Sequence, residues 1–287
     1  AFAMLVGSGG APRAAIAMGQ QDHDTAEKIV GNCFTLLTGL AVILTILFYI
    51  SAPTLLKLFG ASNATMSYAT AYARIYILGS FFVLIVLGMN PFITTQGFAK
   101  ISMMTTVIGA VINIILDPVF IFVLGMGVKG AALATVLSQA VGAIWILCFL
   151  TGKKTILRLK KESMRLEVRV FGPCLALGIS TFVMLSTESL LSISFTNSLS
   201  RYDGDVAVGA MTIITSINQL VAMPVQGICQ GGQPIISYNY GADKPERVKK
   251  AFFTQFCACV AYTFTFWAVI MFFPQVFASI FTANKEL

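Results

Sequence analysis

Charged residues are scarce in this chain. Asp, Glu, Lys and Arg make up 11% of its 287 residues, whereas a soluble globular chain has about 25%. Hydrophobic residues make up 57%, and the mean hydropathy is +0.83. A soluble domain of this length cannot bury so much apolar surface in its core. We therefore expect a lipid bilayer to be the solvent for much of the chain.

Residues that bind metals or nucleotides are also few. His23 is the only histidine, and none of the six cysteines stands at a metal-ligand spacing. No glycine-rich segment carries the lysine of a phosphate-binding loop. We therefore expect no metal, no other cofactor and no enzymatic activity. The net charge of +7 does not indicate nucleic acid, because the basic residues lie in loops between apolar segments.

Long apolar segments dominate what is present. A helix that crosses a bilayer needs about 20 apolar residues. Seven segments are of this kind: 29–51, 66–90, 101–123, 130–150, 171–198, 206–238 and 248–273. Residues 1–19 look like the end of an eighth, and a start inside an apolar segment without Met predicts a truncated chain. The predicted fold is an all-α polytopic membrane protein with about eight helices.

The loops between these segments differ in charge. Loops 20–28, 96–101, 151–170 and 241–250 hold thirteen lysines and arginines. The intervening side holds four: Lys57, Lys129, Arg201 and Lys285. Cytoplasmic loops are the ones enriched in Lys and Arg, so we predict that the first set faces the cytoplasm.

The segment 151–170 divides the chain. It is the longest of the expected cytoplasmic segments, and it mixes leucines with seven basic residues. It could form an amphipathic helix on anionic lipid, but a plain linker is the commoner role. On this interpretation, residues 1–150 form an N-terminal lobe and residues 171–287 a C-terminal lobe.

An internal repeat relates two glycine-rich segments. Residues 9–19 read GGAPRAAIAMG and residues 231–241 read GGQPIISYNYG, which aligns Gly9, Gly10 and Pro12 with Gly231, Gly232 and Pro234 at an offset of 222. Both copies lead into loops of the same side, and parallel repeats are a transporter architecture. A complete chain would have two six-helix lobes, so we expect one first helix and three last helices to be missing. We interpret the glycines and prolines as hinge and packing elements.

These motifs resemble the multidrug and toxic compound extrusion (MATE) family over essentially the whole chain. The resemblance is carried by GSGGAPRAAIAMGQ, NIILDPVFIFVLGMGVKGAALATVLSQ, GISTFVMLSTESLL and GICQGGQPIISYNYGA, in order and at repeat spacing. It implies a secondary active exporter of drugs or toxic metabolites in the bacterial cytoplasmic membrane. Such a transporter would be coupled to H⁺ or Na⁺ and functional as a monomer when full length.

One acidic residue interrupts the apolar segment 101–123. An ionised Asp is costly inside a bilayer helix, so Asp117 is expected to face a wet cavity or a partner. Asn113, four residues earlier, shares its helix face, and the two hard oxygens suit Na⁺ or a proton relay. Pro118 removes a backbone donor and can kink the helix there. An Asp that bonds a neighbouring helix end is the structural alternative.

The resemblance adds two residues to this predicted cation site. In similar proteins, Asn, Asp and Thr at the spacing of Asn113, Asp117 and Thr135 contribute to a cation site, with a further acid on the helix expected to be missing. Glu188, which follows Gly178 by ten residues, matches an acid implicated there in cation or substrate binding. From the residues alone, Thr135 is an ordinary helix contact. An acid near the membrane edge is the corresponding alternative for Glu188.

A polar stripe follows the segment 206–238. It runs through Gln219, Met223, Gln226 and Gln230 in steps of three or four. A stripe that faces lipid would not hold three glutamines, and amides beside an adaptable Met suit a pocket for varied amphipathic cations. A polar seam between helices explains the stripe nearly as well.

These features predict a secondary antiporter. A cation would bind the carboxylates, change the charge of the cavity and shift the protein between inward- and outward-facing states. The alternative within the same superfamily is a flippase for a lipid-linked precursor. A flippase for anionic headgroups should carry several basic residues in its cavity, and the predicted spans are nearly free of them. Intramembrane acids without basic partners disfavour a scaffold that transports nothing.

Overall fold

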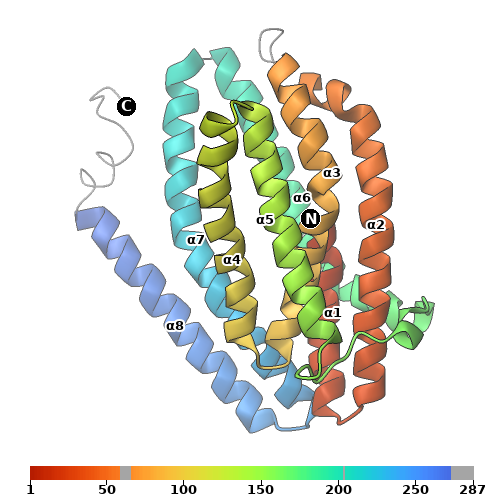
Figure 1. The fold of residues 1–287 in the computed structure, drawn as a ribbon. Helices are drawn as coiled ribbons and strands as arrows, with labels where there is room; N and C mark the ends of the chain where they lie inside the picture. The colour runs from red at the N-terminus through yellow and green to blue at the C-terminus, as the bar shows by residue number, and fades with distance from the viewer. Residues whose placement is uncertain (59–65, 203, 273–287) are drawn as a thin grey trace.

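The computed structural model describes residues 1–58, 66–202 and 204–272, and every regular element among them is helical (Figure 1). The eight α-helices are α1 Phe2–Gly19, α2 His23–Leu58, α3 Met66–Thr95, α4 Ala99–Pro118, α5 Val128–Thr151, α6 Val168–Tyr202, α7 Gly204–Gly241 and α8 Pro245–Phe272. A π-helix, η1 Val119–Val123, follows α4, and a 3₁₀-helix, η2 Lys161–Met164, precedes α6. The all-α prediction and the expected number of helices are confirmed.

Six helices in the described part are long and apolar enough to cross a bilayer. They are α2, α3, α4 with η1, α5, α6 and α8. The segment predicted at 206–238 is helical as α7, but it is not among these six helices of the described part. The chain is a multi-pass membrane protein.

Successive helices run in opposite directions, so their connections alternate between two ends of the molecule (Figure 1). The connections at 20–22, 96–98, 152–167 and 242–244 share the lower end in this view. The structure therefore places the Lys- and Arg-rich loops on one side, as predicted. On the opposite side, Lys57 ends α2 and Lys129 begins α5. Lys285 and the side chain of Arg201 lie outside the described residues.

The cytoplasmic location of the lower end is a prediction that labelling can check. In a variant without the native cysteines, Lys153→Cys should react with an impermeant maleimide only after the cytoplasmic side is opened. Lys57→Cys, at the opposite end, should react in intact cells. Labelling of position 153 from outside intact cells would reverse the assigned topology.

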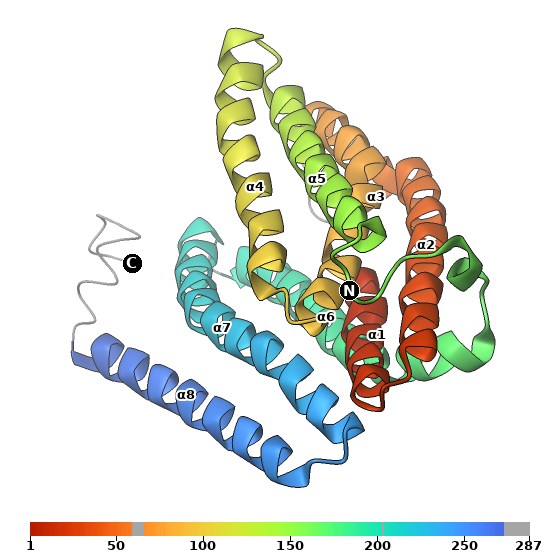
Figure 2. The same ribbon diagram turned by 60° about the horizontal axis from the view of Figure 1, so that its bottom comes forward.

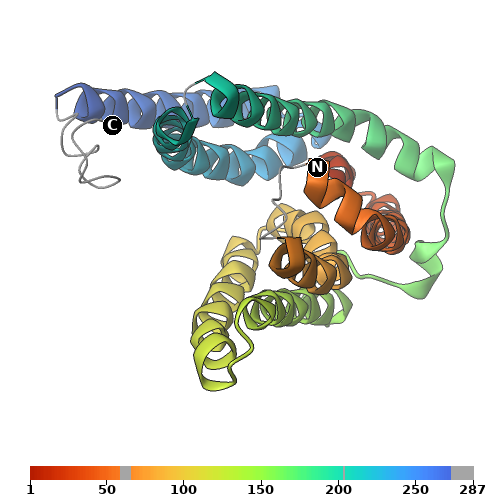
Figure 3. The ribbon, with the colours of Figure 1, turned by 90° about the horizontal axis from the view of Figure 1, so that it is seen from above.

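Helix α1 is the central element of the described chain. Most of its residues are buried, and it packs against α2, α3, α6 and α7. Seen from above, α2–α5 lie on one side of α1 and α6–α8 on the other (Figure 3). This arrangement is compatible with the predicted lobes at 1–150 and 171–287, whose independence stays a prediction.

The predicted repeat is visible in the backbone of two turns. The α1–α2 turn and the α7–α8 turn each contain one residue with positive φ, Gln21 at 62° and Asp243 at 53°. Three backbone hydrogen bonds close the first turn: Gln20 donates to Ile16, Gln21 to Met18 and Asp22 to Ala17. Three equivalent bonds close the second: Ala242 donates to Tyr238, Asp243 to Tyr240 and Lys244 to Asn239. Every position differs by 222, so the repeat extends to the hydrogen-bond pattern. Figure 2 brings these turns forward.

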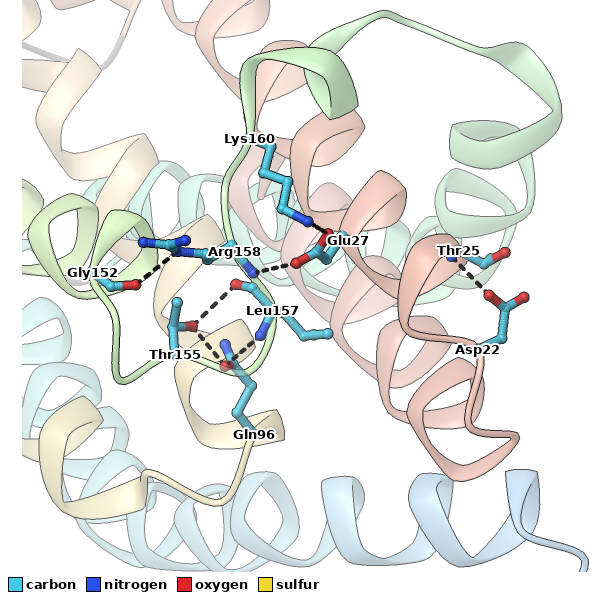
Figure 4. A network of polar contacts seen from close by, with 9 residues as sticks. All are labelled: Asp22, Thr25, Glu27, Gln96, Gly152, Thr155, Leu157, Arg158 and Lys160. Atoms are coloured by element: carbon cyan, nitrogen blue, oxygen red, sulfur yellow. Dashed lines mark hydrogen bonds and ion pairs between the residues drawn. The ribbon is translucent and has the colours of Figure 1, made fainter.

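Residues 152–167, called the strap below, join α5 to α6 and do not form a long amphipathic helix. Gln96, next to the end of α3, holds the first part of the strap (Figure 4). Its Oε1 accepts hydrogen bonds from Thr155 Oγ1 at 2.7 Å and from the amides of Ile156 at 2.7 Å and Leu157 at 2.9 Å. One buried side chain therefore satisfies three donors of an irregular segment.

The N-terminal turns of α2 hold the next part of the strap. The Glu27 carboxylate accepts hydrogen bonds from the Arg158 amide at 3.2 Å and from Lys160 Nζ, with which it forms an ion pair (Figure 4). The nearby carboxylate raises the pKa of Lys160 through this hydrogen bond and its charge. Asn32 Nδ2 donates to the Ser163 carbonyl at 3.2 Å, and its Oδ1 accepts from the Glu167 amide at 2.7 Å. The strap is thus fixed to α2 and α3, and the interpretation of 151–170 as an amphipathic helix is wrong.

Candidate functional site

Asp117 and Asn113 lie one turn apart on the last two turns of α4. Both side chains are partly enclosed. Asp117 Oδ1 and Asn113 Nδ2 are buried and have no hydrogen-bond partner among the described residues. Buried polar atoms without partners are uncommon because their desolvation is not offset. Asp117 Oδ1 is therefore, among the described residues, an unpartnered acceptor oxygen at the position where the sequence predicted a cation site.

The register of α4 against α5 brings Thr135 to the same level. Two contacts set this register: a Cβ on Gly109 would lie 3.8 Å from the Ser138 carbonyl oxygen, an ordinary contact, and a Cβ on Gly130 would lie 2.8 Å from the Phe120 backbone. Because the helices are antiparallel, Asn113 and Thr135 lie at the same level along the two helices, between these two contacts. Thr135 Oγ1 donates its proton to the Ala131 carbonyl at 3.0 Å. Its oxygen lone pairs remain available as acceptors, which suits a cation ligand.

Pro118 ends the regular part of α4. Proline has no amide proton, so the carbonyl four residues earlier loses its helical partner. The chain continues as the π-helix Val119–Val123 rather than as an α-helix. Such π segments are rare and are frequent at functional sites. The predicted change of helix geometry next to Asp117 is present, and the predicted role of Pro118 as a hinge stays a prediction.

Glu188 lies on α6, away from the α4–α5 pair. Its side chain is exposed, and it forms no ion pair within the described ranges. Met184, one turn earlier on the same face, is also exposed. The structure therefore does not join Glu188 to Asp117 in one site, so the two acids occupy separate helices on opposite sides of α1.

The predicted stripe on α7 is exposed along its length. Gln219, Gln226 and Gln230 are exposed, and Met223 is 64% exposed. In the part of the chain that the structure describes, these amides do not form a polar seam with a neighbouring helix. The stripe thus leaves three amides available, and its contact with substrate stays a prediction.

The glycine motif of α1 lies at its crossing with α6. A Cβ on Gly9 would overlap the Cys174 carbonyl oxygen, and a Cβ on Gly178 would overlap the carbonyl oxygen of Leu5. The two backbones are therefore in direct contact, which only glycine permits. Pro12 lies inside α1 and Pro234 inside α7.

The second motif mirrors part of this packing. Gly10 makes room for the Cys33 thiol of α2, and Gly232 makes room for the Gln255 side chain of α8. These contacts are related by the offset of 222. At Gly231, in contrast, a Cβ would meet no atom within 4 Å. The packing part of the prediction therefore has a physical basis at Gly9, Gly10 and Gly232, and none among the described residues at Gly231.

A reciprocal contact joins the lower ends of α1 and α7. A Cβ on Gly19 would overlap the Tyr238 carbonyl oxygen, and one on Gly241 would overlap the carbonyl oxygen of Ile16. Gly19 corresponds to Gly241 and Ile16 to Tyr238 in the repeat. The two repeats therefore contact each other in a pseudo-twofold symmetric way, and this contact holds the lower ends of α1 and α7 together.

Sequence reasoning missed Gln96, Glu27 and Asn32, which hold the strap. A glutamine beside a helix end has no distinctive spacing. The available signal in the sequence was Gly97, which follows the end of α3 and adopts a φ of 86° where the chain turns away. Within residues 1–58, 66–202 and 204–272, no three His, Cys, Asp or Glu side chains form a candidate metal site.

The fold and the two related turns define a repeat-built, multi-pass membrane protein. The family model described as MatE matches residues 1–119 and 180–287. The chain belongs to the MATE family. Its relatives are named as export proteins rather than enzymes.

Individual relatives agree with this assignment. The multidrug export protein MepA of Staphylococcus saprophyticus subsp. saprophyticus is 26% identical over 84% of this chain and 53% of that protein. The MATE multidrug transporter DinF-BH, solved as a complex with a ligand, is 33% identical with a TM-score of 0.89, over 99% of this chain and 64% of that one. A MOP superfamily transporter from Pyrococcus furiosus, whose reverse polarity of binding pocket suggests a different function, has 25% identity and a TM-score of 0.89, over 99% of this chain and 63% of that one. The chain spans about half the length of the curated relatives it matches.

Proposed function

We propose that this chain is part of a secondary active exporter that antiports cationic or amphipathic drugs against H⁺ or Na⁺. The observation that carries the proposal is the buried, unpartnered Oδ1 of Asp117 beside the unpartnered amide of Asn113. A carboxylate in this setting gains from binding a proton or a small hard cation, because either one replaces the lost hydration. The names of the multidrug-exporting relatives support the same function.

Asn113, Asp117 and Thr135 would form the first-lobe cation site. Asn113 would offer its carbonyl oxygen after a flip of the amide, since its nitrogen is the atom without a partner. Thr135 would add a hydroxyl oxygen from the facing helix. The coupling ion is the only cofactor in this scheme.

The drug would bind to Glu188 and to the polar stripe on α7. The acid on α6 supplies a negative charge, while Gln219, Met223, Gln226 and Gln230 supply adaptable amide and thioether surfaces. Loading the coupling ion would change the charge of the cavity and hence its affinity for a cationic drug. Binding at the two sites would be linked through the states of the whole transporter.

The contact between α1 and α7 would be one of the switching elements. Gly19 and Gly241 hold the lower ends together, so a state open at that end would need this crossing to separate. Backbone contacts through glycine can form and break without repacking large side chains. The complete transporter would work as a monomer, because each copy would contain both repeats.

A flippase for a lipid-linked precursor is the second candidate, since a similar superfamily transporter is described as having a different function. Anionic headgroups would need basic residues in the cavity. Few basic residues lie within the predicted spans, and one of them, Arg74, lies over the Tyr49 ring at 5.8 Å from its centroid. This favours drug export over headgroup transport.

Glu188→Gln tests the substrate part of the proposal. We expect export of a cationic dye to fall by about tenfold and export of a neutral compound to fall by less than about twofold, because a carboxylate attracts only the cation in a low-dielectric cavity. Efflux assays in cells that express equal amounts of each variant would measure both. Ser189→Ala, at the next position on α6, is the matched control and should leave both unchanged. Equal losses for both compounds would contradict a charge-reading role for Glu188.

A further inference from the structure

The strap has two chemically different faces. In its extended part, Thr155, Leu157 and Leu159 are buried against α2 and α3, while the residues between them point outward. This alternation is the period of two of an extended chain. The hydrogen bonds to Gln96 and Glu27 fix which face is outward. The outer face is therefore a defined surface and not the average of a flexible loop.

Basic residues cover the outer face. Seven are exposed between the end of α5 and the first turn of α6: Lys153, Lys154, Arg158, Lys160, Lys161, Arg165 and Arg169. Among the described residues, only Lys160 of this group forms an ion pair, with Glu27. Two exposed acids, Glu162 and Glu167, accompany them. Most of the positive charge of the strap is thus left without a protein partner.

The position of the strap fixes what this charge can meet. The strap joins α5 to α6, and both of these helices are candidate membrane spans that end or begin at its two ends. Its contacts on α2 lie within the first turns of another candidate span. The strap therefore lies at the level where the helices leave the bilayer, beside the lipid headgroups.

Apolar side chains stand among the cations. Ile156 is 45% exposed, Leu166 49% and Val168 73%, and none of them has a place in the core of the bundle. Cations interleaved with exposed apolar side chains are typical of surfaces that lie in a membrane interface. A soluble acidic protein would match the charge but would leave these side chains without an apolar environment.

We infer that the outer face of the strap binds the anionic headgroups of phospholipids in the leaflet on its side of the membrane. The Lys and Arg side chains would contact the phosphates, and Ile156, Leu166 and Val168 would enter the acyl boundary. The strap is bonded to α2 and α3 and continues into α6. A bound lipid would therefore contact the connection between the two groups of helices that flank α1.

Native mass spectrometry of the complete transporter in detergent, titrated with phosphatidylglycerol or with phosphatidylcholine, tests this inference. We expect phosphatidylglycerol to bind at least about tenfold more tightly than phosphatidylcholine, since each cation near an anionic surface contributes favourably. The variant Lys153→Gln/Lys154→Gln/Lys161→Gln/Arg165→Gln should lose this preference. The matched control Lys244→Gln/Arg247→Gln/Lys249→Gln/Lys250→Gln removes the same charge at the same end, from the α7–α8 turn and start of α8, and should keep it.

Three results would overturn the inference. The first is equal affinity of the wild type for the two lipids. The second is an equal loss in both quadruple variants, which would indicate only a general charge effect. The third is undiminished binding in the strap variant.

If the strap variant unfolds, the salt dependence of lipid binding by the wild type tests the inference instead. Binding through exposed charges should weaken between 0.1 M and 1 M NaCl, because the Debye length shortens from about 10 Å to about 3 Å. Binding that does not weaken would contradict the inference. Competition by millimolar glycerol phosphate without any acyl chain would show a soluble phosphate site instead of a lipid surface.

Discussion

Asp117→Asn is expected to abolish gradient-driven export and to leave the protein folded. The substitution keeps the size of the side chain, but the amide cannot carry a charge or exchange a proton at neutral pH. Since Asp117 Oδ1 has no hydrogen-bond partner among the described residues, the substitution removes no hydrogen bond of this oxygen within them. An Asn also avoids the cost of placing a charge in a membrane helix. Loss of function without loss of stability is therefore the distinctive expectation.

Drug efflux at matched expression measures this effect. We expect the efflux rate to fall by at least about tenfold. A loss of about 1.4 kcal/mol in the free energy of cation binding already lowers the affinity for the cation tenfold. Asp24→Asn makes the same chemical change in the exposed first turn of α2 and should leave efflux near the wild-type rate. Wild-type efflux in the Asp117 variant would remove this residue from the mechanism. A variant that does not reach the membrane would instead assign Asp117 a structural role.

Gly178→Ala should destabilise the protein even though alanine favours helices. A Cβ at this position would overlap the Leu5 carbonyl oxygen, and its third neighbour, Leu5 Cα, would lie at 3.1 Å. The neighbours are backbone atoms, so α1 and α6 must move apart. Overpacking of this kind costs about 1–3 kcal/mol. The crossing at the centre of the molecule would loosen.

Gly172→Ala, on the same helix, is the control, and its expected change in stability has the opposite sign. A Cβ there meets no atom within 4 Å, so only the helix preference of alanine remains, about 0.5–1 kcal/mol in favour of the fold. Thermal unfolding in detergent should show a lower midpoint for Gly178→Ala and an unchanged or higher midpoint for Gly172→Ala. Equal midpoints would contradict the close α1–α6 crossing.

The helices and the repeat could be predicted because they depend on local sequence. The length of the apolar segments predicts the membrane spans, and the distribution of Lys and Arg predicts which loops share a side of the membrane. The motif pair Gly9–Gly10 and Gly231–Gly232 gave the offset of 222, and the turns at Gln21 and Asp243 follow it down to single hydrogen bonds. Asp117 and Asn113 were accessible for the same reason, since a polar residue in an apolar helix stands out.

The strap and the glycine crossings could not be predicted, because they depend on residues far apart in the chain. Gln96 binds amides about 60 positions away, and Asn32 binds residues about 130 positions away. The segment 151–170 has an amphipathic composition, yet its backbone is satisfied by these side chains and not by a helix. The neighbours of Gly178 and Gly19 likewise come from other helices, so their spacing gave no sign of them.

Transport into vesicles would show whether export is coupled to a cation gradient through Asp117. The complete transporter that contains these residues would be reconstituted without nucleotide, and the movement of a cationic dye followed while a H⁺ gradient or a Na⁺ gradient is imposed alone. We expect the dye to move against its own gradient with one of the two ions. This movement should stop when that ion gradient is collapsed, and it should be absent in the Asp117→Asn variant. Dye movement that is indifferent to both gradients, or that survives in this variant, would contradict cation-coupled export through the Asp117 site.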